Sequence, residues 1–323
     1  MSTKEAILSC LAEESGRWVS GERLSRRLGL SRAAVSKHVR SLRQMGYVIE
    51  SRPKRGYALR ERSPDLLPGE IRHGLQTAVF GKQEIQYFVE TDSTNTCAKA
   101  LALEGAPEGT LVAAEAQTGG RGRLGRAWYS PPGQAVYLSL VLRPRMSPLD
   151  VPKITLIAAV AAAEAVRTIS PVAVRIKWPN DLLVRGKKIA GILTEAGTEA
   201  DVIGYVIVGL GLNVNTEGFP EPIRNTATSL FLETGTRFSR AQLVREYLTR
   251  FEEAYERTSR EGFAPIIERW KTLSDAMGRR VAVEMLEERL VGRVRDVDAD
   301  GFLVVEEDGG AIRRVFSGDV FYV

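Results

Sequence analysis

The chain has 323 residues, with 45 Lys and Arg, 40 Asp and Glu, and a formal net charge of +5. Because 44% of its residues are hydrophobic and 26% are charged, it can fill two or three folded cores, which excludes disordered and low-complexity proteins. The charge is uneven: residues 1–62 hold 14 Lys and Arg against 6 Asp and Glu, a net of +8, so the other 261 residues carry −3. This distribution predicts a basic module joined to a nearly neutral one.

The composition also excludes several kinds of site. The chain has only two histidines, His38 and His73, and two cysteines, Cys10 and Cys97, which are too few for a zinc site or a disulfide framework. Neither histidine lies near a nucleophile motif. The most apolar stretch, residues 154–166, is too short to span a bilayer. We therefore expect a cytoplasmic protein with no membrane partner.

The first 62 residues predict three helices and a β-hairpin. Ser20 and Ser31 are suitable N-caps for the second and third helices, and Gly29 forms the tight turn between them. The expected elements are helices around Ala6–Leu11, at Gly21–Leu28 and at Arg32–Met45, and strands at Tyr47–Glu50 and Tyr57–Leu59, joined by Pro53–Gly56. This order of elements is typical of a winged helix-turn-helix.

Basic side chains fall where such a fold contacts DNA. They lie on the third helix and at the turn of the hairpin, where Lys and Arg bind phosphates and the helix reads base edges. The alternative is a solvated basic face on a small helical domain. The candidate DNA-binding residues are Arg32, Ser36, Lys37, Arg40, Lys54 and Arg55. Residues 63–69 contain two prolines and predict a linker.

Residues 70–275 alternate strand and helix patterns, which is typical of α/β or α+β domains. The predicted strands are Ile85–Glu90, Leu111–Ala116, Ala135–Leu142, Val172–Trp178, Ile189–Glu195 and Tyr205–Leu212. The predicted helices are Thr94–Leu103, Val151–Ile169, Arg240–Thr258 and Ala264–Leu273. The last 45 residues or so change to short strands separated by Asp-Gly turns, which predicts a small separate β-barrel.

The segment Gln117–Trp128 combines glycines with three arginines. Gly120, Gly122 and Gly125 match the dinucleotide-binding pattern, but Ser130-Pro131-Pro132 stops the helix that this pattern requires. Arginines on a glycine-rich backbone suit binding of phosphate or carboxylate. We expect a loop whose arginines repel one another until an anion binds; the alternative is a flexible basic surface turn.

Two more segments carry charge near strand ends. Val184–Lys187 is a natural hairpin turn, so the strands on either side can bring Lys177, Asp181 and Lys188 close together. Lysines at this position can stabilise a leaving phosphate, and an aspartate can hold Mg²⁺. The alternative, for any one of these residues taken alone, is an ion pair on an edge strand. Upstream, Thr91–Asn95 either caps a helix or hydrogen-bonds a small polar ring.

These segments together resemble the family of bifunctional biotin–protein ligases and biotin-operon repressors. The residues that carry the resemblance are Gly120–Trp128, Lys177-Trp-Pro-Asn-Asp181, Lys188-x-Ala190-Gly191-Ile192-Leu193 and Gly209-x-Gly211-x-Asn213-Val-Asn215. Leu124 departs from the pattern, since some relatives have an arginine there. The resemblance implies an α+β protein: a winged helix at 1–62, a linker at 63–69, a mixed α/β ligase core similar to class II synthetases at 70–275, and an SH3-like barrel at 276–323.

The resemblance also implies a reaction in which biotin and ATP form biotinyl-5′-AMP, and a lysine of a biotin carboxyl carrier domain then accepts biotin. The implied biotin-binding residues are Ser93, Thr94, Asn95, Gln117, Arg121, Gly122, Arg123 and Lys188. The implied nucleotide-binding residues are Lys177, Asp181, Asn213 and Trp128, with Asp181 as the candidate Mg²⁺ ligand. Arg121, Arg123, Lys177 and Lys188 are the implied catalytic residues.

The implied partners are the carrier domain of acetyl-CoA carboxylase or related carboxylases, and operator DNA. Biotinyl-5′-AMP acts as corepressor in such proteins, and we expect it to favour a homodimer that presents two winged helices to two half-sites. Two alternatives stay open: a lipoate–protein ligase of the same superfamily, and a repressor that senses a ligand without catalysis.

Overall fold

The computed structural model describes residues 3–14, 16–199, 202–285 and 288–323. The described residues separate into two compact units, with the division between Gly74 and Leu75. Among the described residues, no helix is long and apolar enough to cross a membrane.

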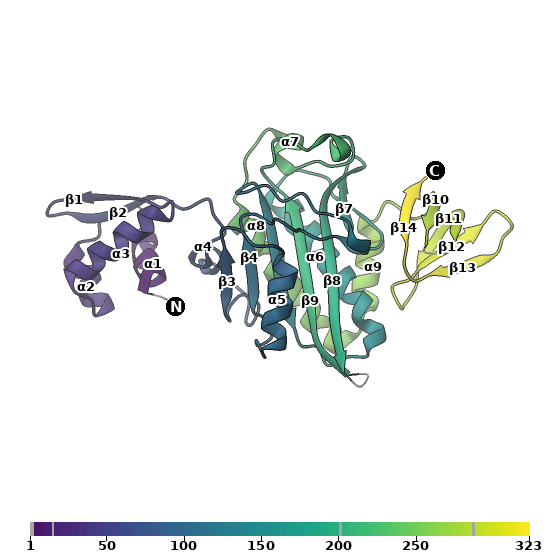
Figure 1. Cartoon of the computed structure of the whole chain (residues 1–323), viewed down its shortest axis with the longest axis horizontal. Helices are drawn as coiled ribbons and strands as arrows, with labels where there is room; N and C mark the ends of the chain where they lie inside the picture. Colours follow the sequence, from purple (N-terminus) through teal and green to yellow (C-terminus); the bar gives the residue numbers. More distant parts are fainter. Residues whose placement is uncertain (1–2, 15, 200–201, 286–287) are drawn as a thin grey trace. The chain divides into compact units, whose positions relative to one another are not determined.

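The N-terminal unit is a winged helix, as predicted (Figure 1). Its helices are α1 (Thr3–Glu13), α2 (Gly21–Leu28) and α3 (Arg32–Gln44), and its hairpin consists of β1 (Val48–Arg52) and β2 (Gly56–Glu61). The side chains of Ser20 and Ser31 accept hydrogen bonds from Arg23 N and Ala34 N, which confirms both N-caps. Gly29 has a φ of 65°, so the turn between α2 and α3 uses the left-handed conformation that glycine favours.

This unit extends beyond the hairpin. Pro68–Arg72 forms the short helix α4, with proline in its first turn. Buried Glu70 accepts a hydrogen bond from Arg62 at 2.6 Å, and Arg72 pairs with Glu5 of α1 at 2.9 Å. The second half of the predicted linker therefore begins a helix that packs on the winged helix. The boundaries of the domains stay predictions.

The second unit contains a seven-stranded sheet in the order β3-β4-β5-β9-β8-β7-β6. Among the strand pairs of the described residues, only β3–β4 is parallel. The strands are β3 (Ile85–Phe88), β4 (Leu111–Ala114), β5 (Ala135–Leu142), β6 (Arg175–Lys177), β7 (Asp181–Val184), β8 (Lys187–Glu199) and β9 (Val202–Asn213). The predicted hairpin between β7 and β8 is confirmed, with Arg185 and Gly186 at φ values of 49° and 79°.

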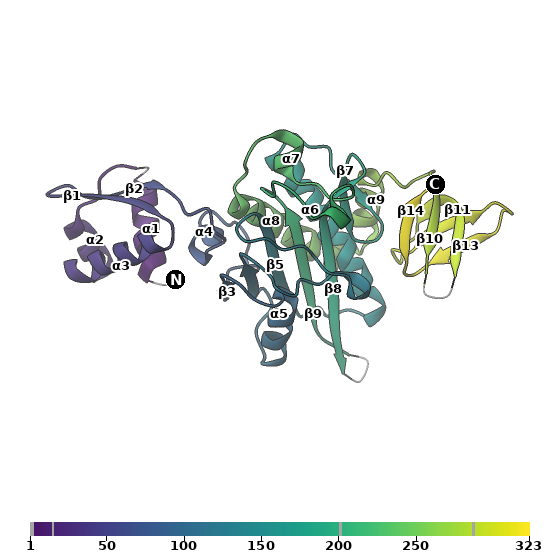
Figure 2. The same ribbon diagram turned by 45° about the horizontal axis from the view of Figure 1, so that its top comes forward.

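Helices cover both faces of this sheet (Figures 1 and 2). Helix α5 (Thr94–Leu103) lies on one face, where Ala98 and Ala102 pack with Val112, Val141 and Ile207. The other face carries α6 (Val151–Ile169), α8 (Arg240–Glu261) and α9 (Ala264–Leu273). The connecting segments include α7 (Leu230–Thr234) and three short 3₁₀ helices, η1 (Arg123–Gly125), η2 (Pro148–Asp150) and η3 (Glu221–Ile223).

The C-terminal residues form a five-stranded antiparallel sheet in the order β13-β12-β11-β10-β14, which agrees with the predicted all-β region. Its strands are β10 (Arg280–Glu284), β11 (Arg289–Val297), β12 (Leu303–Glu307), β13 (Ile312–Val315) and β14 (Asp319–Tyr322). Hydrogen bonds from Trp178 Nε1 to Gly301 O and from Tyr322 to Asp275 link this sheet to the ligase-like core.

Candidate active site

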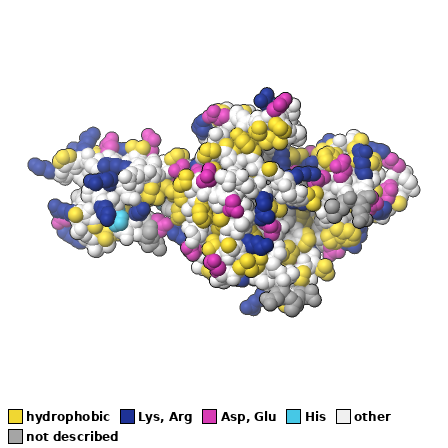
Figure 3. All heavy atoms as spheres, in the orientation of Figure 1, with side chains coloured by type: hydrophobic (Ala, Val, Ile, Leu, Met, Phe, Trp, Pro, Cys, Tyr) yellow, Lys and Arg dark blue, Asp and Glu magenta, His cyan; other side chains and the backbone are white. Residues whose placement is uncertain are grey.

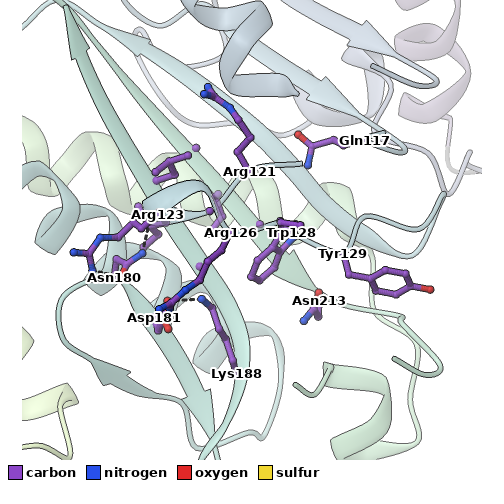
Figure 4. Close-up of a pocket in the computed structure, with 18 of the residues that line it drawn as sticks. Gln117, Arg121, Arg123, Arg126, Trp128, Tyr129, Asn180, Asp181, Lys188 and Asn213 are labelled. Carbon is purple, nitrogen blue, oxygen red and sulfur yellow. Dashed lines mark hydrogen bonds and ion pairs between the residues drawn. The ribbon is translucent and has the colours of Figure 1, made fainter. Parts of the chain in front are cut away.

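A pocket forms where the glycine- and arginine-rich loop crosses β8 and β9 (Figure 4). Its wall draws on the start of α5, the loop, β7 to β9, and residues 219–227. The sequence-predicted residues that line it are Ser93, Thr94, Asn95, Gln117, Arg121, Gly122, Arg123, Trp128, Asp181, Lys188 and Asn213. Segments spread over more than a hundred residues therefore converge on one cavity. Lys177 is the predicted ligand-binding residue that lies outside this lining.

One end of the pocket is a network of buried polar side chains. Gln117 Oε1 accepts hydrogen bonds from Thr94 N at 2.9 Å and from Thr94 Oγ1 at 3.2 Å. Gln117 Nε2 donates to Ser130 Oγ at 3.0 Å, and Ser139 Oγ donates to Asn95 Oδ1 at 2.6 Å. Since Thr94, Asn95 and Ser139 are at most 4% exposed, these partners fix the direction of each donor and acceptor.

Ser93 begins α5 but does not cap it in the expected way. The residue has extended backbone angles and is buried, yet its side chain makes no capping hydrogen bond. Ser93 N instead donates to Asp92 Oδ1 at 2.6 Å. The Ser93 hydroxyl is therefore not used by the helix terminus, and it lies in the wall of the pocket.

Glycines form the floor of the pocket. Gly191 of β8 pairs with Gly211 of β9, and a Cβ atom on Gly211 would lie 2.5 Å from the Trp128 ring. A Cβ atom on Gly209 would lie 2.1 Å from Asn95 Oδ1. Real Cβ atoms do not approach other atoms so closely, so only glycine lets the indole and the amide lie against the sheet.

Asp181 and Lys188 meet at the other end of the pocket, as the hairpin predicts, and Lys177 lies on the neighbouring strand, outside the lining. Lys188 Nζ lies 2.6 Å from Asp181 Oδ1 and 5.3 Å from the centre of the Trp128 ring. Lys177 of β6 lies opposite Asp181 of β7 in the strand register. Its Nζ is 5.3 Å from the centre of the Phe321 ring in the C-terminal sheet. Burial lowers the pKa of Lys177, whereas the Asp181 carboxylate acts in the opposite direction.

Carboxylates of the chain itself pair with the arginines of the loop. Arg121 lies 3.1 Å from Glu195 Oε2, and Arg126 pairs with Asp319 of β14. The expectation that these arginines repel one another until an external anion binds is therefore wrong for Arg121 and Arg126. The reason is that strands distant in sequence supply the opposite charge.

Arg123 connects the loop to the turn between β6 and β7 and to the residues directly before β14. Its guanidinium donates to Asn180 Oδ1 at 3.3 Å, to Gly318 O at 3.4 Å and to Ser317 Oγ at 3.1 Å. Burial lowers the pKa of Arg123, so its positive charge is partly desolvated at the edge of the pocket. An anion bound nearby would compensate for that lost hydration.

The residues present suit a magnesium ion that arrives with a phosphate ligand. Among the described residues, no group of three or more His, Cys, Asp and Glu side chains can hold a metal ion. Mg²⁺ is commonly held by one or two carboxylates together with substrate phosphates and water. Asp181 offers one such carboxylate in the pocket wall, beside Lys188.

Sequence reasoning missed several residues of the site. Tyr129 and Phe219 form an edge-to-face pair at 6.1 Å and add an aromatic wall near Asn213. Ser139 is the single serine in the apolar run of β5, which is a signal that the sequence does contain. Glu195 was identified as the end of a strand, but its contacts depend on the sheet register.

The predicted DNA-binding residues all lie on the surface of the winged helix. Lys and Arg side chains stand out on this unit in the space-filling view (Figure 3). Arg32 pairs with Glu22 at 3.1 Å, and Lys54 has a φ of 63° at the tip of the hairpin. The exposed candidates are Arg32, Ser36, Lys37 and Arg40 on α3, and Lys54 and Arg55 between β1 and β2.

Comparison with known proteins agrees with this architecture. Residues 87–213 match the Biotin/lipoate A/B protein ligase family, residues 3–58 match an HTH domain, and residues 276–323 match the Biotin protein ligase C terminal domain. The bifunctional ligase/repressor BirA of Bacillus subtilis is 37% identical over 319 residues, which cover 98% of each chain. BirA of Escherichia coli is 32% identical over 298 residues, covering 91% of this chain and 90% of the relative.

A solved structure shows the same fold for most of the second unit. The biotin protein ligase of Aquifex aeolicus, in complex with biotin and ATP, has a TM-score of 0.67 and 27% identity. It covers 74% of this chain, and 99% of that ligase is matched. Because the chain has a winged helix and matches two ligase/repressors over nearly their whole length, it belongs to the family of bifunctional biotin–protein ligases and biotin-operon repressors.

Proposed function

We propose that this protein attaches biotin to a lysine of a carrier domain and represses biotin genes when it holds biotinyl-5′-AMP. The observation that carries the ligase proposal is the pocket itself. A buried polar end, a glycine floor and a cluster of cations lie in one cavity. Membership of the ligase/repressor family supports both activities.

In the first step, an oxygen of the biotin carboxylate attacks the α-phosphorus of ATP. A phosphorus–oxygen bond forms, the bond between the α-phosphorus and the bridging oxygen breaks, and pyrophosphate leaves. Both reactants are anions, so the barrier falls when cations neutralise their charge. Lys188 and Arg123 would do this at the carboxylate and the α-phosphate, and Lys177 would act from its position beside Asp181.

In the second step, the carrier lysine attacks the carbonyl carbon of the mixed anhydride. An amide bond forms, the amine loses a proton, and AMP leaves. The anhydride must be protected from water until the lysine arrives, which calls for a closed pocket. The loop that carries Arg121, Gly122 and Arg123 would provide that closure.

The two ends of the pocket would select different parts of the ligand. Ser93, Thr94, Asn95 and Gln117 offer directed hydrogen-bond donors and acceptors that suit the polar ring of biotin. Trp128 would stack on the adenylate, while Asn213 and the Tyr129–Phe219 pair lie where the nucleotide would extend. A magnesium ion bound to the triphosphate would neutralise phosphate charge, with Asp181 as its protein ligand.

The direct test combines purified protein, ATP, radiolabelled biotin and a biotin carboxyl carrier domain. Label should appear on the carrier lysine, and excess lipoate should not compete. Label that never reaches the carrier would refute the ligase proposal and favour a sensor without catalysis. Competition by lipoate would favour the lipoate–protein ligase alternative.

Repression requires that the winged helix bind operator DNA. One such domain contacts few bases, so we propose that biotinyl-5′-AMP favours a homodimer that binds two half-sites. Sedimentation with biotin and ATP should show a doubled mass, and footprinting upstream of biotin genes should show protection that depends on the adenylate. An unchanged mass would refute the dimer.

A further inference from the structure

Glu195 of β8 contacts two parts of the pocket that are distant in the sequence. Asn95 Nδ2 donates to Glu195 Oε2 at 2.7 Å. Arg121 Nη2 donates to Glu195 Oε1 at 3.2 Å and to Oε2 at 3.1 Å. One carboxylate thus joins the buried start of α5 to the loop that crosses the pocket.

The sheet register places this carboxylate on the face of the pocket. Thr194 accepts a hydrogen bond from Thr155 of α6, so it lies on the opposite face. Side chains alternate along a strand, and Glu195 therefore points to the face covered by α5. Its partner across the sheet is Ile207, which packs against Ala98 of α5.

Glu195 fixes the orientation of the Asn95 amide. An ionised carboxylate only accepts hydrogen bonds, so the amide must turn its NH₂ group toward Glu195 and toward Leu193 O, 3.3 Å away. The amide oxygen is then left for Ser139, whose hydroxyl donates to it and lies 2.8 Å from Thr94 Oγ1. Glu195 and Leu193 O thus together set the direction of the Asn95 amide, with Glu195 at the shorter distance.

Glu195 also holds Arg121 beside the pocket. The side chains of Arg121 and Glu195 are 44% and 29% exposed, and ion pairs at such positions add little to global stability. Loss of this pair would therefore release the loop without unfolding the core. Escape of a bound ligand requires that the loop open, so a freer loop shortens the ligand's residence time.

We infer that Glu195 is a positioning residue: it sets the Asn95 amide and holds Arg121 across the pocket, and thereby slows the release of biotin and its adenylate. This inference rests on the proposed ligase function. For substitution of Glu195 it predicts faster release and a raised KM for biotin, with a smaller change in kcat at saturating biotin.

The test is a double-mutant cycle with Glu195→Gln and Arg121→Gln in the full chain. Dissociation of radiolabelled biotin and of its radiolabelled adenylate is followed by rapid filtration after an excess of unlabelled ligand is added. Glu246→Gln is the matched control, since Glu246 is also 29% exposed and paired with an arginine, but lies on α8. Glu195→Gln and Arg121→Gln should each speed dissociation about threefold to tenfold.

The double variant should release ligand no faster than the faster single variant, because both substitutions break the same contact. Release within twofold of the wild type in either single variant would overturn the inference. Additive effects, or an equal effect of Glu246→Gln, would overturn it as well. Wild-type protein that fails to bind biotin would instead refute the proposed function, so the two failures are distinguishable.

Discussion

Gly209→Ala tests whether the glycine floor is required by the position of Asn95. The new Cβ would lie 2.1 Å from Asn95 Oδ1 and 2.9 Å from Asn95 Cγ, whereas ordinary contacts begin at 3.4 Å. The amide would therefore have to move by about an ångström or more. Asn95 cannot make this movement and keep its hydrogen bonds to Ser139, Glu195 and Leu193.

The size of the effect follows from those bonds. A typical intramolecular hydrogen bond contributes about 1 kcal/mol, and disruption of two or three should cost about 2–3 kcal/mol. Since about 1.4 kcal/mol of binding free energy corresponds to a tenfold change in the dissociation constant, biotin affinity should fall about 30-fold to 100-fold. Isothermal titration calorimetry measures the affinity, and urea unfolding measures the loss of stability.

Gly204→Ala is the control on the same strand. A Cβ atom there would meet Gly197 O at 3.6 Å, an ordinary contact, so biotin affinity should be unchanged. Asn95→Ala removes the clashing atoms together with the same hydrogen bonds, so adding Gly209→Ala to Asn95→Ala should cost no further stability, while affinity stays low. Biotin affinity within threefold of the wild type in Gly209→Ala alone would refute the reasoning.

Three other substitutions test separate parts of the molecule. Asp319→Asn removes the carboxylate that pairs with Arg126 and should speed adenylate release about twofold to fivefold; a release rate equal to the wild type contradicts this. The buried Glu252 carboxylate accepts hydrogen bonds from the backbone N–H groups of residues 78–80, and Glu252→Gln weakens these bonds. The free energy of unfolding in urea should therefore fall about 2–3 kcal/mol. A fall below about 1 kcal/mol would show that the carboxylate is dispensable. Lys37→Ala should reduce the slope of log affinity for operator DNA against log salt by about 1, and an unchanged slope would remove Lys37 from the phosphate contacts.

Local signals explain why most helices could be predicted from the sequence. The bounds Gly21–Leu28 follow from the cap at Ser20 and the glycine turn that begins at Gly29. Helix α4 was missed because Pro64 and Pro68 suggested a linker, although Pro68 lies in the first turn of that helix. What fixes α4 is the burial of Glu70 beside Arg62, a tertiary contact that no local pattern contains.

Strand lengths and site contacts depend on pairing between distant segments. The predicted strand Ile189–Glu195 extends to Lys187–Glu199 because its first residues pair with β7 and the rest pair with β9 as far as Glu199. Arg121 and Lys188 could be predicted as site residues because glycine and charge mark their segments. Glu195 and Phe219 could not, since only the register of the sheet brings Glu195 to Asn95 and Arg121, and only the folding of residues 219–227 brings Phe219 to the pocket.

The charges of the pocket show what ligand binding has to replace. Arg121, Lys188 and Arg126 each have a carboxylate of the chain beside them, so the protein itself compensates their positive charges. A ligand anion therefore gains only the difference between its own contacts and those of the carboxylate it displaces. The advantage of this arrangement is that the cations are held in place before the ligand arrives, so little conformational entropy is lost on binding.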